Sequence, residues 1–243
     1  MNGFENSVPL WLIYSWGLSV QYEISPMMAF DVGYQGGHSI HEFSVTEFND
    51  AVPGSTPRQQ RRPYPQLQAY RLVTANGDSK YNSLEMKLQR RPGPSGLSML
   101  LTYTWAKAID TVGSRLGVPG DPGSISRNIS LLRNRGRGDA DIPHRFAGTA
   151  GYETPFGKGK PYLTDHFMGK ILGGWSLNGI LTFQGGAWIT PLIATDRLDV
   201  GSTASSRPDV VRDRNLPSSE RIQTRWFDTT ALALPAPFVY GNA

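Results

Sequence analysis

The feature that most constrains this chain is a two-residue alternation of apolar and polar side chains. From Ser15 to Ile24 every second residue, beginning at Trp16, is apolar, and the residues between them are small or polar. Successive side chains of a β-strand point to opposite faces, whereas a helix repeats about every 3.6 residues, so the pattern predicts a strand with one apolar face. The alternation returns in five further predicted strands: Phe30–Tyr34, Ser83–Gln89, Leu97–Ala106, Arg145–Tyr152 and Trp175–Gln184.

Composition excludes several other classes of protein. The 27 glycines and 18 prolines interrupt the chain too often for an amphipathic helix, so we expect an all-β fold. No apolar run reaches the roughly 18 residues of a membrane-spanning helix. The sequence has no cysteine, which excludes disulfides, thiolate metal sites and cysteine nucleophiles. A net charge of +4 on 243 residues is too small for a nucleic-acid footprint, so we expect no nucleic-acid partner.

The connections between the predicted strands alternate between short and long. The short ones are Ser25–Met27, Pro92–Gly96 and Glu153–Gly173. The long ones are Gly36–Lys80, Lys107–Pro143 and Gly185–Ala243. In an up-and-down meander this places every short turn at one rim and every long loop at the other, which is typical of an outer-membrane barrel. We therefore expect an antiparallel up-and-down meander that forms part of a transmembrane β-barrel, with about six spanning strands and long extracellular loops.

One further segment, Leu67–Ala75, has the composition of a strand and is followed by Asn76-Gly77-Asp78, a good hairpin turn. As a seventh spanning strand it would place long loops at both rims. We expect it instead to form a β-hairpin arm on the long-loop side, continuous with the strand from Ser79 to Arg91.

The two faces of the predicted sheet differ in chemistry. Aromatic residues lie near strand ends and aliphatic residues between them, which favours a barrel wall over the core of a β-sandwich. The expected lipid-facing wall and aromatic girdle are Trp16, Leu18, Val20, Tyr22, Phe30, Tyr34, Leu101, Tyr103, Trp105, Tyr152, Trp175 and Phe183. The expected lumen-facing residues are Gln21, Glu23, Asp31, Glu85, Lys87, Thr102, Thr104, Asn178 and Gln184. We expect the face with Trp16 to be the convex, outward one.

No group of residues indicates catalysis, so we expect no enzyme, no metal and no cofactor. His38, His41 and Glu42 lack the spacing of a zinc site and are interpreted as solvated loop residues. Four carboxylates of one long loop lack the spacing of a calcium-binding loop and are also interpreted as solvated: Asp110, Asp121, Asp139 and Asp141. The Gly157–Lys160 segment lacks the frame of a phosphate-binding loop and is interpreted as a turn.

Several motifs follow one another along nearly the whole chain. They are Trp16–Gln21, Tyr81–Arg91, Gly96–Ser98, Leu101–Asp110, Pro143–Phe146, Tyr152–Gly159, Leu172–Gly179, Arg207–Asp209, Arg225–Thr229 and Tyr240–Ala243. Each motif alone is weak, but the ordered set resembles the barrel region of the Oar-like TonB-dependent outer-membrane receptors.

The resemblance implies a large barrel closed by an N-terminal plug, which takes up a substrate with energy delivered through TonB. Residues 1–243 would then be part of that barrel, without the plug, the TonB box or the last strands. Six strands are also fewer than the eight of the smallest single-chain barrel, so we expect a piece of a longer receptor in the outer membrane. Its partners would be outer-membrane lipid and a transported substrate, with TonB reached only through the absent N-terminal region.

Two alternatives remain open at this point. A surface adhesion or structural protein would use the same barrel wall and long loops for attachment, because a fold does not determine a function. A soluble β-sandwich that binds carbohydrate would also show the alternation, with its apolar faces buried between two sheets.

Overall fold

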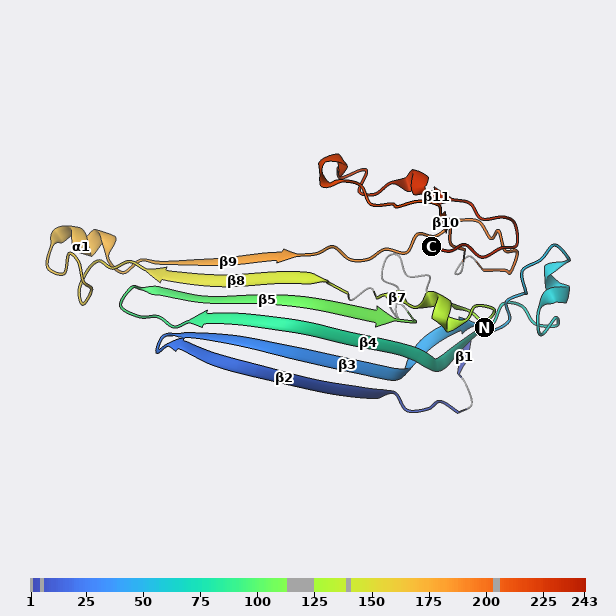
Figure 1. Ribbon diagram of the computed structural model, residues 1–243, viewed down its shortest axis with the longest axis horizontal. Coiled ribbons are helices and arrows are strands. Elements are labelled where there is room, and N and C mark those ends of the chain that lie inside the picture. The colour runs from blue at the N-terminus through green and yellow to red at the C-terminus, as the bar shows by residue number, and fades with distance from the viewer. Residues whose placement is uncertain (1, 5–6, 113–124, 139–140, 203–205) are drawn as a thin grey trace.

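The dominant feature of the fold is one antiparallel sheet of six long strands (Figure 1). The computed structural model describes residues 2–4, 7–112, 125–138, 141–202 and 206–243. In sheet order the strands are β2 (Leu12–Ser25), β3 (Met28–Glu47), β4 (Arg71–Arg90), β5 (Leu97–Asp110), β8 (His144–Glu153) and β9 (Ser176–Gln184). Each pairs with the next along the chain, so the expected all-β up-and-down meander is confirmed.

The short connections lie at one end of the sheet and the long ones at the other (Figure 1). A two-residue turn joins β2 to β3, and residues 91–96 join β4 to β5, with Gly96 at a φ of 74° that favours glycine. The third short connection, residues 154–175, contains the helix α1 (Phe167–Leu172), which the sequence pattern did not predict. The expected separation of short turns from long loops is confirmed.

The strands β3 and β4 extend well beyond the predicted segments and form an arm on the long-loop side. Their pairing continues past a bulge at His41, whose φ is 59°, as far as the pair Glu47 and Arg71. The predicted turn at Asn76-Gly77-Asp78 is wrong, because these residues lie inside β4. Gly77 serves a close approach instead, since a Cβ there would lie 2.5 Å from a methyl of Val112. The residues from Arg71 to Ala75 are therefore a continuation of β4 and no seventh spanning strand.

Short elements surround the ends of the long strands on the long-loop side. Three short strands join the main sheet: β1 (Asn2–Phe4) on β4, β6 (Ile125–Ser126) on β3 and β7 (Gly136–Arg137) on β5. A separate pair is formed by β10 (Asp209–Val210) and β11 (Leu232–Ala233). The single-turn 3-10 helices are η1 (Arg58–Arg61), η2 (Leu131–Asn134), η3 (Ser218–Glu220) and η4 (Thr229–Ala231).

Most of the buried apolar core of the described residues lies among the long loops, with only Ala75 of β4 and Ala106 of β5 buried in the long strands. Ala51, Leu198 and Val200 are 0, 2 and 0 % exposed, and all three belong to loops. By contrast, many large apolar side chains of the long strands are exposed, as Leu18 at 74 % illustrates. An exposed apolar face of this extent marks a surface that contacts something other than water.

The sheet is open within the described residues. The strand β2 pairs with β3 alone, and β9 pairs with β8 alone, so each leaves one edge without a partner. None of the helices in the described part of the chain is long and apolar enough to cross a membrane.

Candidate functional site

The strand register divides the sheet into an apolar and a polar face. Residues directly opposite each other on neighbouring antiparallel strands share one face. One such row crosses all six long strands: Tyr22, Phe30, Leu88, Leu101, Gly148 and Leu181. The adjacent row lies on the opposite face: Gln21, Asp31, Lys87, Thr102, Ala147 and Thr182. One face therefore carries rings and aliphatic chains, and the other carries hydrogen-bonding groups.

The register brings the residues expected to face lipid onto the apolar face. Those that lie in strands share it: Trp16, Leu18, Val20, Tyr22, Phe30, Tyr34, Leu101, Tyr103, Trp105, Tyr152 and Phe183. Trp175 precedes β9 by one residue, and its carbonyl accepts a 2.9 Å hydrogen bond from the Thr154 amide, which continues the ladder by one step. The contact of this face with lipid stays a prediction.

The register also gathers the residues expected to face the lumen. All of them lie on the polar face: Gln21, Glu23, Asp31, Glu85, Lys87, Thr102, Thr104, Asn178 and Gln184. The face is not uniformly polar, because Leu100 and Ile180 lie on it in the row of Glu23. Contact of this face with a lumen likewise stays a prediction.

A hollow of about 480 Å³ lies over the polar face of β2, β3, β4 and β5. Seven of its lining residues bear polar side chains of this face: Ser19, Asp31, Gln35, Glu85, Lys87, Thr102 and Thr104. The Lys87 ammonium lies 4.0 Å from the Asp31 carboxylate, directly across the β3–β4 pair. The arrangement offers donors and acceptors to a polar solute.

The histidines of β3 do not form a metal site. His38 lies 2.5 Å from Asp78, and Glu42 is 2 % exposed and accepts a 2.7 Å hydrogen bond from Ser79. The interpretation of His38, His41 and Glu42 as loop residues is wrong, because the arm extends β3 through all three. Within the described residues, no group of three metal-ligating side chains is placed to hold an ion.

The carboxylates of the β5–β8 loop are less solvated than expected. Asp141 is 1 % exposed and accepts hydrogen bonds from the Ala108 amide at 2.6 Å and from Arg137 at 2.7 Å. Its interpretation as a solvated charge is wrong, because the loop folds back onto the end of β5. Asp110 is the last residue of β5, whereas Asp121 and Asp139 lie outside the described residues.

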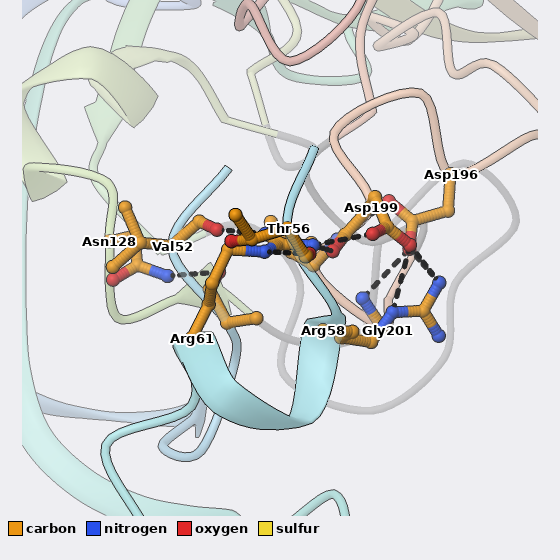
Figure 2. A network of polar contacts seen from close by, with 10 residues as sticks. Val52, Thr56, Arg58, Arg61, Asn128, Asp196, Asp199 and Gly201 are labelled. Atoms are coloured by element: carbon orange, nitrogen blue, oxygen red, sulfur yellow. Dashed lines mark hydrogen bonds and ion pairs between the residues drawn. The ribbon is translucent and has the colours of Figure 1, made fainter. Parts of the chain in front are cut away.

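A network of charged residues ties the long loops to one another (Figure 2). The Asp199 carboxylate accepts hydrogen bonds from Arg58 and Arg61, and Arg61 also donates to the Thr56 carbonyl at 2.7 Å. The Asp196 carboxylate accepts from the backbone amide of Gly201 at 2.7 Å. These bonds fasten the β3–β4 loop to the segment that follows β9.

Other contacts extend this network to the third long loop. The Asn128 side chain donates to the Ala51 carbonyl at 2.9 Å (Figure 2), and the Ala51 amide donates to the Val200 carbonyl at 3.1 Å. We call residues 48–70, 125–134 and 193–201 the loop assembly. Sequence reasoning missed it, because Arg61 and Asp199 are 138 positions apart and neither belongs to a recognisable motif.

The loop assembly contains a buried carboxyl group, Asp50. Burial raises the pKa of Asp50 from 3.8 to about 7, and the nearby Glu47 carboxylate acts in the same direction. Tyr240 lies close by, and burial raises the pKa of its phenol as well. Asp50 therefore changes charge near neutral pH, whereas an exposed aspartate is ionised there.

Comparisons with known proteins agree with the geometry. The family described as outer membrane beta barrel domain matches residues 1–243. Neither a search of curated proteins nor a search of solved structures found a match. The alternative of a soluble β-sandwich is wrong, because the long strands form one sheet and the apolar face is exposed. With its single meander, its exposed apolar face and its match along the whole chain, this protein belongs to the outer membrane beta barrel domain family and resides in the outer membrane.

Proposed function

We propose that this chain forms part of the barrel wall and loops of an Oar-like TonB-dependent receptor, which binds a solute outside the cell and passes it through the barrel. The observation that carries the proposal is the division of six adjacent strands into an exposed apolar face and a polar, hollowed face. The apolar face contacts lipid, and the polar face lines the route of the solute.

The chemistry of the polar face supports binding without a covalent step. Side chains such as Thr102 and Thr104 exchange hydrogen bonds with a solute, and Asp31 and Lys87 present opposite charges. Charged side chains of this kind destabilise a barrel when they face lipid but are tolerated in a water-filled lumen. We therefore propose a binding and transport protein that needs no metal or cofactor of its own.

The open edges of β2 and β9 support the proposal that further strands complete the barrel. Unpaired backbone amides and carbonyls at a sheet edge are not tolerated in lipid, where no water can bind them. We propose that these strands belong to a longer receptor, whose N-terminal region contacts TonB.

Uptake assays test this function and separate it from adhesion. Cells that carry the whole gene and cells in which it is deleted receive labelled oligosaccharides and peptides. Uptake that depends on the gene and stops when the proton gradient is dissipated supports a TonB-dependent receptor. Attachment to these compounds without uptake would identify an adhesion protein instead. Normal uptake by the deletion strain for every compound would contradict the receptor function for these solutes.

A lumen variant links uptake to the polar face. Lys87→Gln removes the cation of the hollow while keeping a polar side chain that is one atom shorter, and we expect it to change the uptake of charged solutes. The matched control is Leu88→Met, one residue away on the apolar face and outside the lining of the hollow. Equal uptake by Lys87→Gln and by the unchanged protein for every charged solute would contradict the assignment of this face to the lumen.

A further inference from the structure

The connection between β8 and β9 presents an exposed apolar helix at the short-turn rim. In α1, Phe167, Met168, Ile171 and Leu172 are 68, 41, 51 and 40 % exposed. At about 100° per residue these four side chains occupy one side of the helix. Such a side is expected to be covered in the working protein, because water contacts it unfavourably.

Close contacts fix the direction in which this apolar side points. Gly169 is buried, and a Cβ there would collide with the carbonyl of Leu163. The Thr154 hydroxyl donates a 3.1 Å hydrogen bond to the Leu172 carbonyl, which fastens the end of α1 to the end of β8. The glycine side of α1 therefore rests on its own connection, and the apolar side points away from it.

Trp175 connects α1 to the apolar face of the sheet. Its indole nitrogen donates a 2.8 Å hydrogen bond to the Ile171 carbonyl, so the ring lies beside the end of the helix. Its carbonyl continues the β8–β9 ladder, two residues before Leu177 of the apolar face. Trp175 therefore lies between the exposed side chains of α1 and the exposed apolar face of the strands.

The charges of the connection suit a membrane surface. Between Thr154 and Trp175 stand three lysines, Lys158, Lys160 and Lys170, and one acidic residue, Asp165. Lys160 pairs with Glu153 at 2.7 Å, while Lys158 and Lys170 are both exposed. A helix with exposed apolar residues and neighbouring lysines is typical of segments that lie in the interface of an anionic membrane.

We propose that α1 is an interfacial helix that lies in the phospholipid leaflet at the short-turn rim. Phe167, Met168, Ile171 and Leu172 enter the boundary between headgroups and acyl chains, and Lys158 and Lys170 face the anionic headgroups. The helix fixes the depth of the β8–β9 corner in the membrane. The inference rests on the proposed contact between the apolar face and lipid.

Single spin labels test the position of α1 separately from that of the wall. Because the sequence has no cysteine, the variants Phe167→Cys, Asp165→Cys and Leu181→Cys each accept one label. The protein assembled in outer membranes is purified and placed in vesicles of phosphatidylethanolamine and phosphatidylglycerol. Collision of each label with oxygen, which concentrates in lipid, is compared with collision with a water-soluble nickel chelate.

The inference expects labels at positions 167 and 181 to collide with oxygen and to be shielded from nickel, and the label at 165 to show the reverse. Nickel access at 167 equal to that at 165, with 181 shielded, would overturn the anchor and leave the wall intact. If the label at 181 is also accessible to nickel, both the anchoring of α1 and the contact of the apolar face with lipid are overturned. Ile171→Cys repeats the test one helical turn away if Phe167→Cys does not assemble.

The lysines provide an independent readout. Adding phosphatidylglycerol to phosphatidylethanolamine vesicles is expected to shield the label at 167 further from nickel. In the background of Lys158→Gln and Lys170→Gln this gain should largely disappear. An equal gain in both backgrounds would show that the lysines do not contact anionic headgroups and would overturn that part of the inference.

Discussion

The Asp199 carboxylate binds Arg61 across 138 positions of sequence and joins the β3–β4 loop to the segment after β9. The Arg61 side chain is only 10 % exposed and also donates to backbone carbonyls, so this contact is part of a partly buried network. The pair therefore holds two loops in a fixed relation at the long-loop end of the strands.

Asp199→Asn is expected to loosen the loop assembly. The change removes the negative charge that two arginines share, and we expect a loss of roughly 1–3 kcal/mol, below the full cost for a buried pair because Asp199 is 35 % exposed. Limited proteolysis of the assembled protein should cut the β3–β4 loop faster. Asp165→Asn, at the opposite rim, is the control, and equal proteolysis of the two variants would contradict the role of the pair.

Asp50 is expected to make the loop assembly less stable as the pH rises from about 4 to about 7. Its pKa is raised from 3.8 to about 7, so over this range the unfolded chain releases a proton that the folded loops retain. Stability then falls by at most roughly 1.4 kcal/mol per pH unit, is highest below pH 4 and levels off above pH 7.

Asp50→Asn should flatten this pH dependence and raise stability at pH 8. Hydrogen exchange of the loop amides, followed from pH 4 to pH 8, measures the effect. Asp213→Asn, at an exposed carboxylate, serves as the control. A pH dependence that survives unchanged in Asp50→Asn would assign it to another group.

Gly77→Ala is expected to destabilise the β3–β4 arm. A Cβ there would lie 2.5 Å from a methyl of Val112 and 3.0 Å from the Glu42 carbonyl oxygen, and relieving such overlap typically costs about 1–3 kcal/mol. Gly179→Ala is a matched control, because a Cβ at Gly179 meets nothing within 4 Å. Denaturant unfolding should give a lower midpoint for Gly77→Ala than for Gly179→Ala. Similar midpoints would show that the arm relaxes around the added Cβ at little cost and would contradict the prediction.

Arginine at two neighbouring positions of β5 tests the faces of the sheet. Leu101 lies on the apolar face and Thr102 on the polar face. If the apolar face contacts lipid, Leu101→Arg should cost about 2–4 kcal/mol near the bilayer midplane, whereas Thr102→Arg should leave the fold nearly unchanged. Unfolding in lipid vesicles measures both. Equal losses, or a larger loss for Thr102→Arg, would contradict the assignment of the faces.

The strands were predictable because their signal is local. Each strand, such as Ser15–Ile24, shows the two-residue alternation within its own sequence. This alternation also favours a register in which the apolar residues of neighbouring strands share one face of the sheet. The arm on the long-loop side was also expected, but its pairing was not, because the sequence predicted a hairpin turn at residues 76–78 and the structure pairs β4 with β3 there. The residues around Gly77 have the composition of a turn. They lie instead inside β4, because the neighbouring strand β3 pairs with β4 at this point. The helix α1 was missed because six residues are too few for a helical period to emerge.

The sequence by itself determined the six-stranded meander, the two chemically distinct faces and the separation of short turns from long loops. Alternation, turn residues and connection lengths are properties of neighbours along the chain, and they suffice for these features. Only the tertiary structure decided how the loops assemble, which carboxylates are buried and where α1 points. Contacts such as Arg61 with Asp199 and Trp175 with α1 depend on the positions in space at which the strands end. Asp50 becomes buried only when loops that are distant in sequence pack around it.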